Sequence, residues 1–237
     1  MAREMLKVSG LEAGYGRKQI LYGIDLVAQT SEMVAVIGHN GAGKSTLLKA
    51  VFGLIPVWKG SVSYDGRDTT GSTPGENIRN GLAYVPQGNR VFGELSIREN
   101  LEMGAYTLDG RTEVERKITE VYAVFPALKQ REKQIAGTLS GGEKQMLALA
   151  NILVHSPKLL LLDEPSLGLS PPSVKDAFQK ITDLNRAFGT TVVFVEQMVR
   201  EVLKISQRTY LLKMGRVAYE GSSAALLDGV RIREIFL

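Results

Sequence analysis

The chain has 237 residues, 44% of them hydrophobic and 23% charged, which are proportions typical of a folded globular protein. They exclude a disordered chain, a collagen-like repeat and a coiled coil. The 29 Lys and Arg against 25 Asp and Glu leave a net charge of +4, which suits a nucleotide or an anionic surface but falls short of a nucleic-acid-binding protein. The chain has no cysteine, which excludes disulfides, thiolate metal sites and cysteine nucleophiles.

The apolar runs of the sequence are short. Strongly apolar stretches such as residues 34–37, 159–162 and 192–195 fall far short of the roughly 18 residues that cross a bilayer. Residues 1–8 alternate charged and apolar side chains without an apolar core, so no secretory signal is expected. We therefore expect a folded protein that stays in the cytoplasm.

Short strands separated by glycine turns are predicted in the first third of the chain. We expect them around residues 7–8, 21–28 and 60–64, with a turn at residues 64–66, Tyr-Asp-Gly. This pattern indicates an antiparallel β layer.

A helical stretch follows. Ser96 with Glu99, and Thr112 with Glu115, both fit the S/T-x-x-E capping box. Helices are predicted to begin at each and to fill much of residues 97–125.

Helices and strands then alternate, which predicts a parallel sheet covered by helices. The apolar runs at 159–162 and 191–195 do not alternate in polarity, as expected for strands buried on both faces. The helix between them is predicted to begin at Pro171, after a Ser170 cap, and to stop at Gly189.

The domain organisation predicted is a single α/β domain over residues 1–237. Residues 1–90 and 156–237 are expected to form a mostly parallel core sheet with the β layer, and residues 91–155 a helical subdomain. After Arg208 we expect one more strand, a turn at residues 214–215 and a short amphipathic tail.

One segment between a predicted strand at 33–37 and a predicted helix matches G-x-x-x-x-G-K-[ST] in full. Its residues are Gly38, His39, Asn40, Gly41, Ala42, Gly43, Lys44 and Ser45, and Thr46 follows. The helix is predicted from apolar side chains at helical spacing, which are Leu47, Leu48, Val51 and Leu54. Glycines let successive backbone N–H groups face one anion at a helix N-terminus, so we expect this loop to hold the phosphates of a nucleotide. Lys44 would reach the β and γ phosphates and Ser45 would bind Mg²⁺, whereas a ligand-free glycine turn leaves Lys44 unexplained.

Two acids follow the apolar run at 159–162. Strand ends of this kind are where open α/β sheets bind ligands, so Asp163 is predicted to hold the magnesium ion, usually through water. Glu164 is predicted to be catalytic, accepting a proton from the attacking water or orienting it. The alternative is a pair of solvated turn acids. Together with the phosphate loop, the pair indicates an NTPase.

A second glycine-rich helix start lies at residues 139–145. Ser140 and Glu143 have capping-box spacing, so a simple cap is one interpretation. Two consecutive glycines in a first helical turn cost about 1 kcal/mol each relative to alanine, which a helix needing only a cap would not favour. Ser140, Gly141 and Gly142 are therefore predicted to form a second anion site, completed by another subunit.

These motifs, in this order, resemble those of the ATPase subunit of an ABC transporter, and the resemblance covers essentially the whole chain. It implies a P-loop NTPase cassette. It also implies a head-to-tail dimer that sandwiches two ATP molecules, each between the phosphate loop of one subunit and Ser140, Gly141 and Gly142 of the other.

The same resemblance implies roles for isolated residues. Tyr15 matches the aromatic that stacks on adenine, although a packing role is the alternative. Gln87, after a predicted strand at 82–85, matches the glutamine that senses magnesium and communicates with the membrane subunit, and a plain loop residue is its alternative. Residues 166–170 resemble the loop that touches the partner's site.

One position departs from the family pattern. Gln197 stands where most members have a histidine that contacts the γ phosphate. Its amide can donate a hydrogen bond but carries no charge, which puts the usual histidine role in doubt and leaves Gln197 as a predicted catalytic residue.

Residues 84–92, 166–169 and 195–197 resemble the shorter ATPase of bacterial branched-chain amino acid importers, and the urea and short-chain amide importers are close. The resemblance implies a like or unlike second ATPase, two transmembrane permease subunits and, indirectly, a periplasmic or lipid-anchored binding protein. It places the chain on the cytoplasmic side of the inner membrane.

Two other classes remain as alternatives. A soluble ABC ATPase acting on ribosomes or DNA usually has tandem cassettes or coiled-coil inserts, and the chain shows neither, so no nucleic-acid partner is expected. A module that binds nucleotide without hydrolysis is disfavoured by the intact Asp163 and Glu164.

Overall fold

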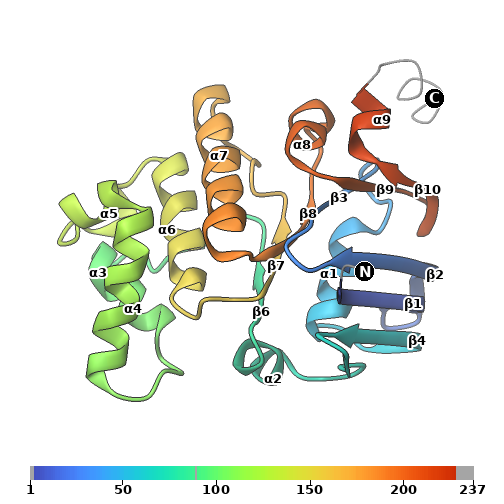
Figure 1. Ribbon diagram of the computed structural model, residues 1–237, viewed down its shortest axis with the longest axis horizontal. Coiled ribbons are helices and arrows are strands. Elements are labelled where there is room, and N and C mark those ends of the chain that lie inside the picture. The colour runs from blue at the N-terminus through green and yellow to red at the C-terminus, as the bar shows by residue number, and fades with distance from the viewer. Residues whose placement is uncertain (1–2, 89, 228–237) are drawn as a thin grey trace.

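The computed structural model describes residues 3–88 and 90–227, and within them the strands form two sheets (Figure 1). The antiparallel sheet has the order β2-β1-β4-β5, and the second sheet the order β10-β9-β3-β8-β7-β6. The strands of the first are β1 (Glu4–Tyr15), β2 (Lys18–Gln29), β4 (Val57–Tyr64) and β5 (Arg67–Asp68). Those of the second are β3 (Met33–Ile37), β6 (Leu82–Val85), β7 (Leu159–Asp163), β8 (Thr191–Val195), β9 (Arg208–Lys213) and β10 (Arg216–Ser222). Both the mostly parallel core sheet and the antiparallel layer are thereby confirmed.

The α-helices of the described residues are α1 (Lys44–Phe52), α2 (Pro74–Arg79), α3 (Ile97–Gly104), α4 (Arg111–Val124), α5 (Pro126–Gln130), α6 (Gly141–Leu153), α7 (Pro171–Phe188), α8 (Val199–Ile205) and α9 (Ser223–Leu227). Figure 1 shows α3 to α6 gathered at one end of the molecule, with β1, β2 and β4 at the other. Every helix in the described part of the chain is too short or too polar to cross a lipid bilayer.

Both faces of the parallel sheet are covered, which explains the unbroken apolar strands. Val34 and Leu161 point into the core that the sheet shares with α1 and the antiparallel layer. Ala35, Leu160 and Phe194 point into the other core, which includes side chains of α6, α7 and α8. Because successive strand residues face opposite sides, every position of β3, β7 and β8 is buried, and all but Asp163 and Thr191 are apolar.

The strands of the antiparallel layer are longer than predicted. Gly10 in β1 and Gly23 in β2 have φ of 57° and 70°, and the β1–β2 register shifts around Gly10. Such glycines resemble turns in the sequence, but they are accommodated as irregularities inside a continuous strand.

Three helix predictions need correction. α4 begins at Arg111 after Gly110, whose φ of 85° turns the chain, so Thr112 lies inside the first turn and caps nothing. α1 ends at Phe52 because Gly53 is left-handed, which leaves Leu54 outside the helix and exposed. α7 has the predicted bounds, but its Ser170 hydroxyl contacts Ser173 Oγ at 3.0 Å and makes no backbone cap.

The segment after the turn at residues 214–215 also differs from the prediction. Residues Arg216–Ser222 form strand β10, which pairs antiparallel with β9, and α9 follows. The remainder of the predicted tail, residues 228–237, lies outside the described residues.

Candidate active site

Four loops that carry predicted site residues meet at one edge of the parallel sheet. The phosphate loop follows β3, Gln87 follows β6, the acid pair ends β7 and Gln197 follows β8. β3, β8, β7 and β6 are parallel neighbours in that order, so their carboxyl ends share an edge. A cavity of about 390 Å³ opens there. Its lining residues are Ile20, Asn40, Gly41, Gly43, Lys44, Ser45, Thr46, Gln87, Glu164 and Gln197.

The glycines of the phosphate loop are required by its packing. Gly43 has a φ of 101°, and a Cβ there would lie 2.8 Å from Leu21 Cδ2. A Cβ on Gly38 would lie 2.3 Å from the Leu212 carbonyl oxygen. Only glycine allows the backbone to approach its neighbours this closely and to take the left-handed conformation.

Lys44 lies inside the loop and is only 5% exposed. Its Nζ donates to the carbonyl oxygens of Gly38, at 2.8 Å, and His39, at 3.2 Å. Burial lowers the pKa of Lys44, opposed by the nearby carboxylates of Glu164 and Asp163. The ammonium is thus held within the loop that would surround a phosphate.

Ser45 and Asp163 join the phosphate loop to the acid pair. Ser45 Oγ donates to Asp163 Oδ1 at 2.7 Å, and Gln87 Nε2 lies 3.3 Å from the Ser45 hydroxyl and 3.4 Å from Asp163 Oδ1. The Tyr84 hydroxyl donates to Asp163 Oδ2 at 3.0 Å. A hydroxyl, a carboxylate and a side-chain amide are hard oxygen donors, which fits a magnesium ion that also takes substrate phosphates as ligands.

Glu164 and Gln197 form the other polar pair of the site. Glu164 is buried, has a φ of 50° and donates its backbone N–H to the Val195 oxygen at 3.0 Å. Gln197 Nε2 donates to Glu164 Oε1 at 2.8 Å. Left-handed backbone is unfavourable for a residue with a Cβ, and such strain is common at functional sites.

The N-terminus of α6 carries the capping box that the sequence allowed. Glu143 N donates to Ser140 Oγ at 3.3 Å, and Ser140 N donates to Glu143 Oε2 at 2.8 Å. The two glycines differ. A Cβ on Gly142 would lie 2.8 Å from Ser173 Oγ, whereas one on Gly141 would have its nearest neighbours at 4.0 Å. Packing against α7 therefore accounts for Gly142, and the argument for close approach of a ligand rests on Gly141.

Other predicted residues lie apart from this cavity within one chain. Ser140 and Gly142 line a different cavity, between α5, α6 and α7. Tyr15, at the end of β1, is 45% exposed and is not among the lining residues.

Two functional candidates were missed from the sequence. Tyr84 contacts Asp163, and burial together with the Asp163 charge raises its pKa. Glu196 is only 1% exposed and lies next to Gln197. A charged residue directly after the apolar run 191–195 was the available signal for Glu196, whereas nothing local distinguishes Tyr84 from a core tyrosine.

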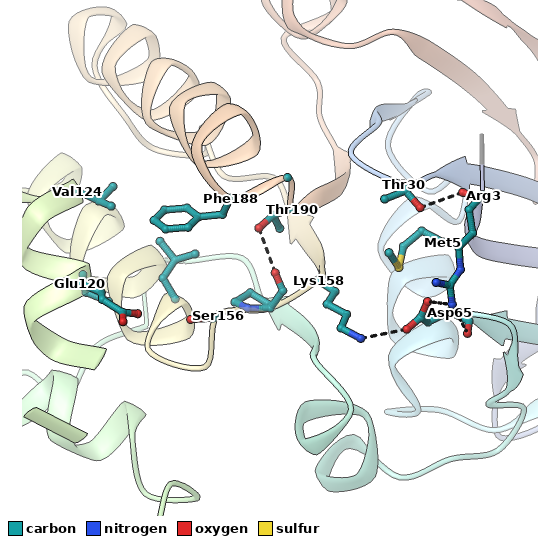
Figure 2. A pocket seen from close by; sticks show the side chains of 14 residues that line it. Arg3, Met5, Thr30, Asp65, Glu120, Val124, Ser156, Lys158, Phe188 and Thr190 are labelled. Atoms are coloured by element: carbon teal, nitrogen blue, oxygen red, sulfur yellow. Dashed lines mark hydrogen bonds and ion pairs between the residues drawn. The ribbon is translucent and has the colours of Figure 1, made fainter. Parts of the chain in front are cut away.

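A second cavity, of about 530 Å³, lies at the opposite edge of the sheet, near the start of β7 and β8 (Figure 2). Arg3 and Lys158 both pair with Asp65, at 2.5 and 3.1 Å, and Phe188 and Val124 line its apolar side. Because both cations are already paired with the Asp65 carboxylate, this cavity is a poorer phosphate site than the one around Lys44.

Comparison with known proteins agrees with this geometry. Residues 21–167 match the family described as ABC transporter. The chain is 41% identical over 98% of its length to the high-affinity branched-chain amino acid transport ATP-binding protein BraG of Pseudomonas aeruginosa, covering 99% of that protein. It is 42% identical to the probable branched-chain amino acid transport ATP-binding protein LivF of Archaeoglobus fulgidus, over 98% of both chains.

A solved structure is similar as well. The dimeric post-hydrolysis state of the ATP-binding cassette MJ0796, bound to ADP and Pi, superposes with a TM-score of 0.80 at 26% identity. The match covers 92% of this chain and 99% of that one. The chain therefore belongs to the ABC transporter family, as an ATP-binding cassette.

Proposed function

We propose that the chain is the ATP-hydrolysing subunit of an ABC importer for branched-chain amino acids. The observation that carries the proposal is the 2.7 Å hydrogen bond from Ser45 Oγ to Asp163 Oδ1, which unites the phosphate loop and the acid pair in one site. The two relatives named for branched-chain amino acid transport support the choice of substrate.

The nucleotide would be held mainly by the phosphate loop, with Tyr15 stacking on adenine. The loop residues proposed are Gly38, His39, Asn40, Gly41, Ala42, Gly43, Lys44, Ser45 and Thr46. Magnesium would be held by Ser45, Asp163 and Gln87, and when bound it neutralises phosphate charge.

Glu164 and Gln197 would carry out the protein's part of the chemistry. Glu164 accepts the proton of the attacking water or orients that water toward the γ phosphate. Gln197 fixes the Glu164 carboxylate through the 2.8 Å hydrogen bond and, as a neutral amide, can also donate to a phosphate oxygen.

A second ATPase subunit, alike or different, would complete each site with its Ser140, Gly141 and Gly142. Two features support this proposal: Ser140 and Gly141 are exposed at the start of α6, and a Cβ on Gly141 would have no neighbour nearer than 4.0 Å. The dimeric state of the similar cassette supports it further.

Membrane partners would dock near the helical subdomain, which we propose spans residues 91–155. An apolar groove of about 410 Å³ is lined by side chains that follow Gln87 along the chain, among them Phe92, Met103 and Tyr106. All three are strongly exposed, with Tyr106 at 74%. Exposed aromatic and Met side chains typify protein interfaces, so we assign this groove to one of the two permease subunits. The permeases would hold the chain at the cytoplasmic side of the inner membrane.

A phosphate-release assay tests the ATPase assignment. Wild-type protein is expected to hydrolyse ATP only when magnesium is present, and Lys44→Ala to lose nucleotide binding. Lys49→Ala, on the same helix but outside the lining of the site, is the matched control and is expected to behave as wild type. Undiminished hydrolysis by Lys44→Ala would contradict the proposed site.

Transport tests the substrate. The chain is co-purified with its membrane subunits, reconstituted in vesicles with the binding protein, and supplied with labelled leucine or urea. ATP-dependent leucine uptake supports the proposal, whereas urea uptake alone would assign the chain to the amide importers.

A further inference from the structure

A buried carboxylate that the proposed chemistry does not use lies beside the site. Glu196 directly follows β8 and is 1% exposed. Taking a carboxylate out of water is costly unless hydrogen bonds replace its hydration. Burial raises the pKa of Glu196, although hydrogen bonds from Ser166 and Gln197 oppose the shift.

The hydrogen bonds of Glu196 come from two different loops. Ser166 N donates to Glu196 Oε1 at 2.8 Å, and Ser166 Oγ donates to Oε2 at 2.8 Å. The backbone N–H of Gln197 donates to Oε2 at 3.0 Å. One carboxylate therefore binds the loop after β7 and the loop after β8 together.

These contacts complete a closed ring around the catalytic pair. Ser166 lies two residues beyond Glu164 in the loop after β7, and Gln197 is the second residue of the loop after β8. Glu164 N donates to the Val195 oxygen, and Gln197 Nε2 returns to Glu164 Oε1. A shift of either loop would therefore change the separation between the Glu164 carboxylate and the Gln197 amide.

We propose that Glu196 is a positioning residue for hydrolysis, which holds the loop after β7 against the loop after β8 and so keeps the Gln197 amide on Glu164. This inference rests on the proposed function. Glu196 also anchors the start of loop 166–170, which is proposed to face the partner subunit.

Glu196→Gln is a sharp test because an amide cannot replace both oxygens. Oε1 accepts from the Ser166 N–H and Oε2 from the Gln197 N–H. In either amide orientation, the new NH₂ group faces a backbone N–H donor, so at least one of these backbone hydrogen bonds is lost.

We expect Glu196→Gln to lower kcat about ten-fold or more, the change that corresponds to one lost hydrogen bond to a charged group, with the KM for ATP unchanged. Glu201→Gln is the matched control, because Glu201 lies on α8 and, within the part of the chain that the structure describes, pairs only with Lys204. A wild-type kcat for Glu196→Gln would overturn the inference.

A double-mutant cycle separates positioning from a general loss of structure. If Glu196 acts through Gln197, then Glu196→Gln is expected to have little further effect on kcat in a Gln197→Ala background. Multiplicative effects would overturn the inference.

Ser166→Ala covers the case in which Glu196→Gln fails to fold. This substitution removes only the hydroxyl donor and is expected to lower kcat by a smaller factor than Glu196→Gln does. A wild-type kcat for Ser166→Ala would count against the inference. If Glu164→Gln hydrolyses ATP at the wild-type rate, the proposed catalytic assignment itself fails. If Glu164→Gln is inactive while Glu196→Gln is fully active, only the inference about Glu196 fails.

Discussion

Gln197 Nε2 donates a 2.8 Å hydrogen bond to Glu164 Oε1, so the two predicted catalytic side chains are in direct contact. The amide fixes one carboxylate oxygen and leaves the other available to a water molecule. It does not titrate near neutral pH, unlike the histidine expected from the family pattern. Gln197 therefore still orients the Glu164 carboxylate but cannot carry the positive charge of a protonated histidine.

Gln197→Ala is expected to lower ATP turnover about ten-fold while leaving the nucleotide Kd nearly unchanged, because the lost bond orients Glu164 rather than the nucleotide. Steady-state phosphate release and nucleotide titration measure the two effects separately. Gln179→Ala, which removes an exposed glutamine on α7 bonded to Asp183, is the control. Wild-type turnover in Gln197→Ala would show that the position is a bystander.

The two glycines at the start of α6 are expected to respond differently to alanine. At Gly142 the new methyl meets Ser173, and overpacking of this kind costs about 1–3 kcal/mol, more than the helix propensity that alanine contributes. Gly142→Ala should therefore have a lower Tm than Gly141→Ala, and adding Ser173→Gly should restore it. Equal Tm values for the two alanine variants would show that the contact with Ser173 does not constrain Gly142.

Gly141→Ala should instead affect association. Its methyl would have no neighbour nearer than 4.0 Å in one chain but would stand where the partner's nucleotide approaches. ATP-dependent dimerisation should therefore weaken while the Tm is maintained. The double variant Gly142→Ala with Ser173→Gly is the control and is expected to form the ATP-dependent dimer. Size-exclusion chromatography with ATP compares the two variants.

Glu143 makes the capping box of α6 sensitive to acid. The backbone hydrogen bond from Ser140, followed by that from Arg131, lowers the pKa of Glu143. A lowered pKa means that the stabilisation is present above the pKa of the unfolded chain and is lost as pH falls through the folded value. The side chain is 37% exposed, so solvent screening limits the contribution to below about 1 kcal/mol.

The difference in free energy of unfolding between wild type and Glu143→Ala should therefore stay constant from neutral pH to about pH 5 and shrink below it. Urea unfolding at a series of pH values measures this difference. A difference that persists unchanged at pH 3 would show that Glu143 does not act through its charge.

Contiguous motifs explain how much of the site could be predicted. The phosphate loop and the acid pair are each continuous in sequence and border strands with unbroken apolar runs, so both their chemistry and their place at the strand ends could be read directly. The contact between Gln197 and Glu164 joins residues 33 positions apart and depends on β7 and β8 being neighbours. Sequence spacing alone does not specify that pairing.

Errors in the predicted fold have local causes. Thr112 and Glu115 have capping-box spacing, but Gly110 turns the chain two residues earlier and the helix begins before Thr112. The sequence also does not reveal that Gly142 packs on Ser173, because this contact depends on how α6 lies against α7.

The most direct test of the account is ATP hydrolysis and assembly by Glu164→Gln. The substitution keeps the shape of the side chain but removes the base, so phosphate release should fall by about 10²–10⁴-fold while ATP binding is retained. ATP should then trap a dimer, which light scattering detects by its mass. Hydrolysis at the wild-type rate would contradict the assignment of Glu164 as the catalytic base.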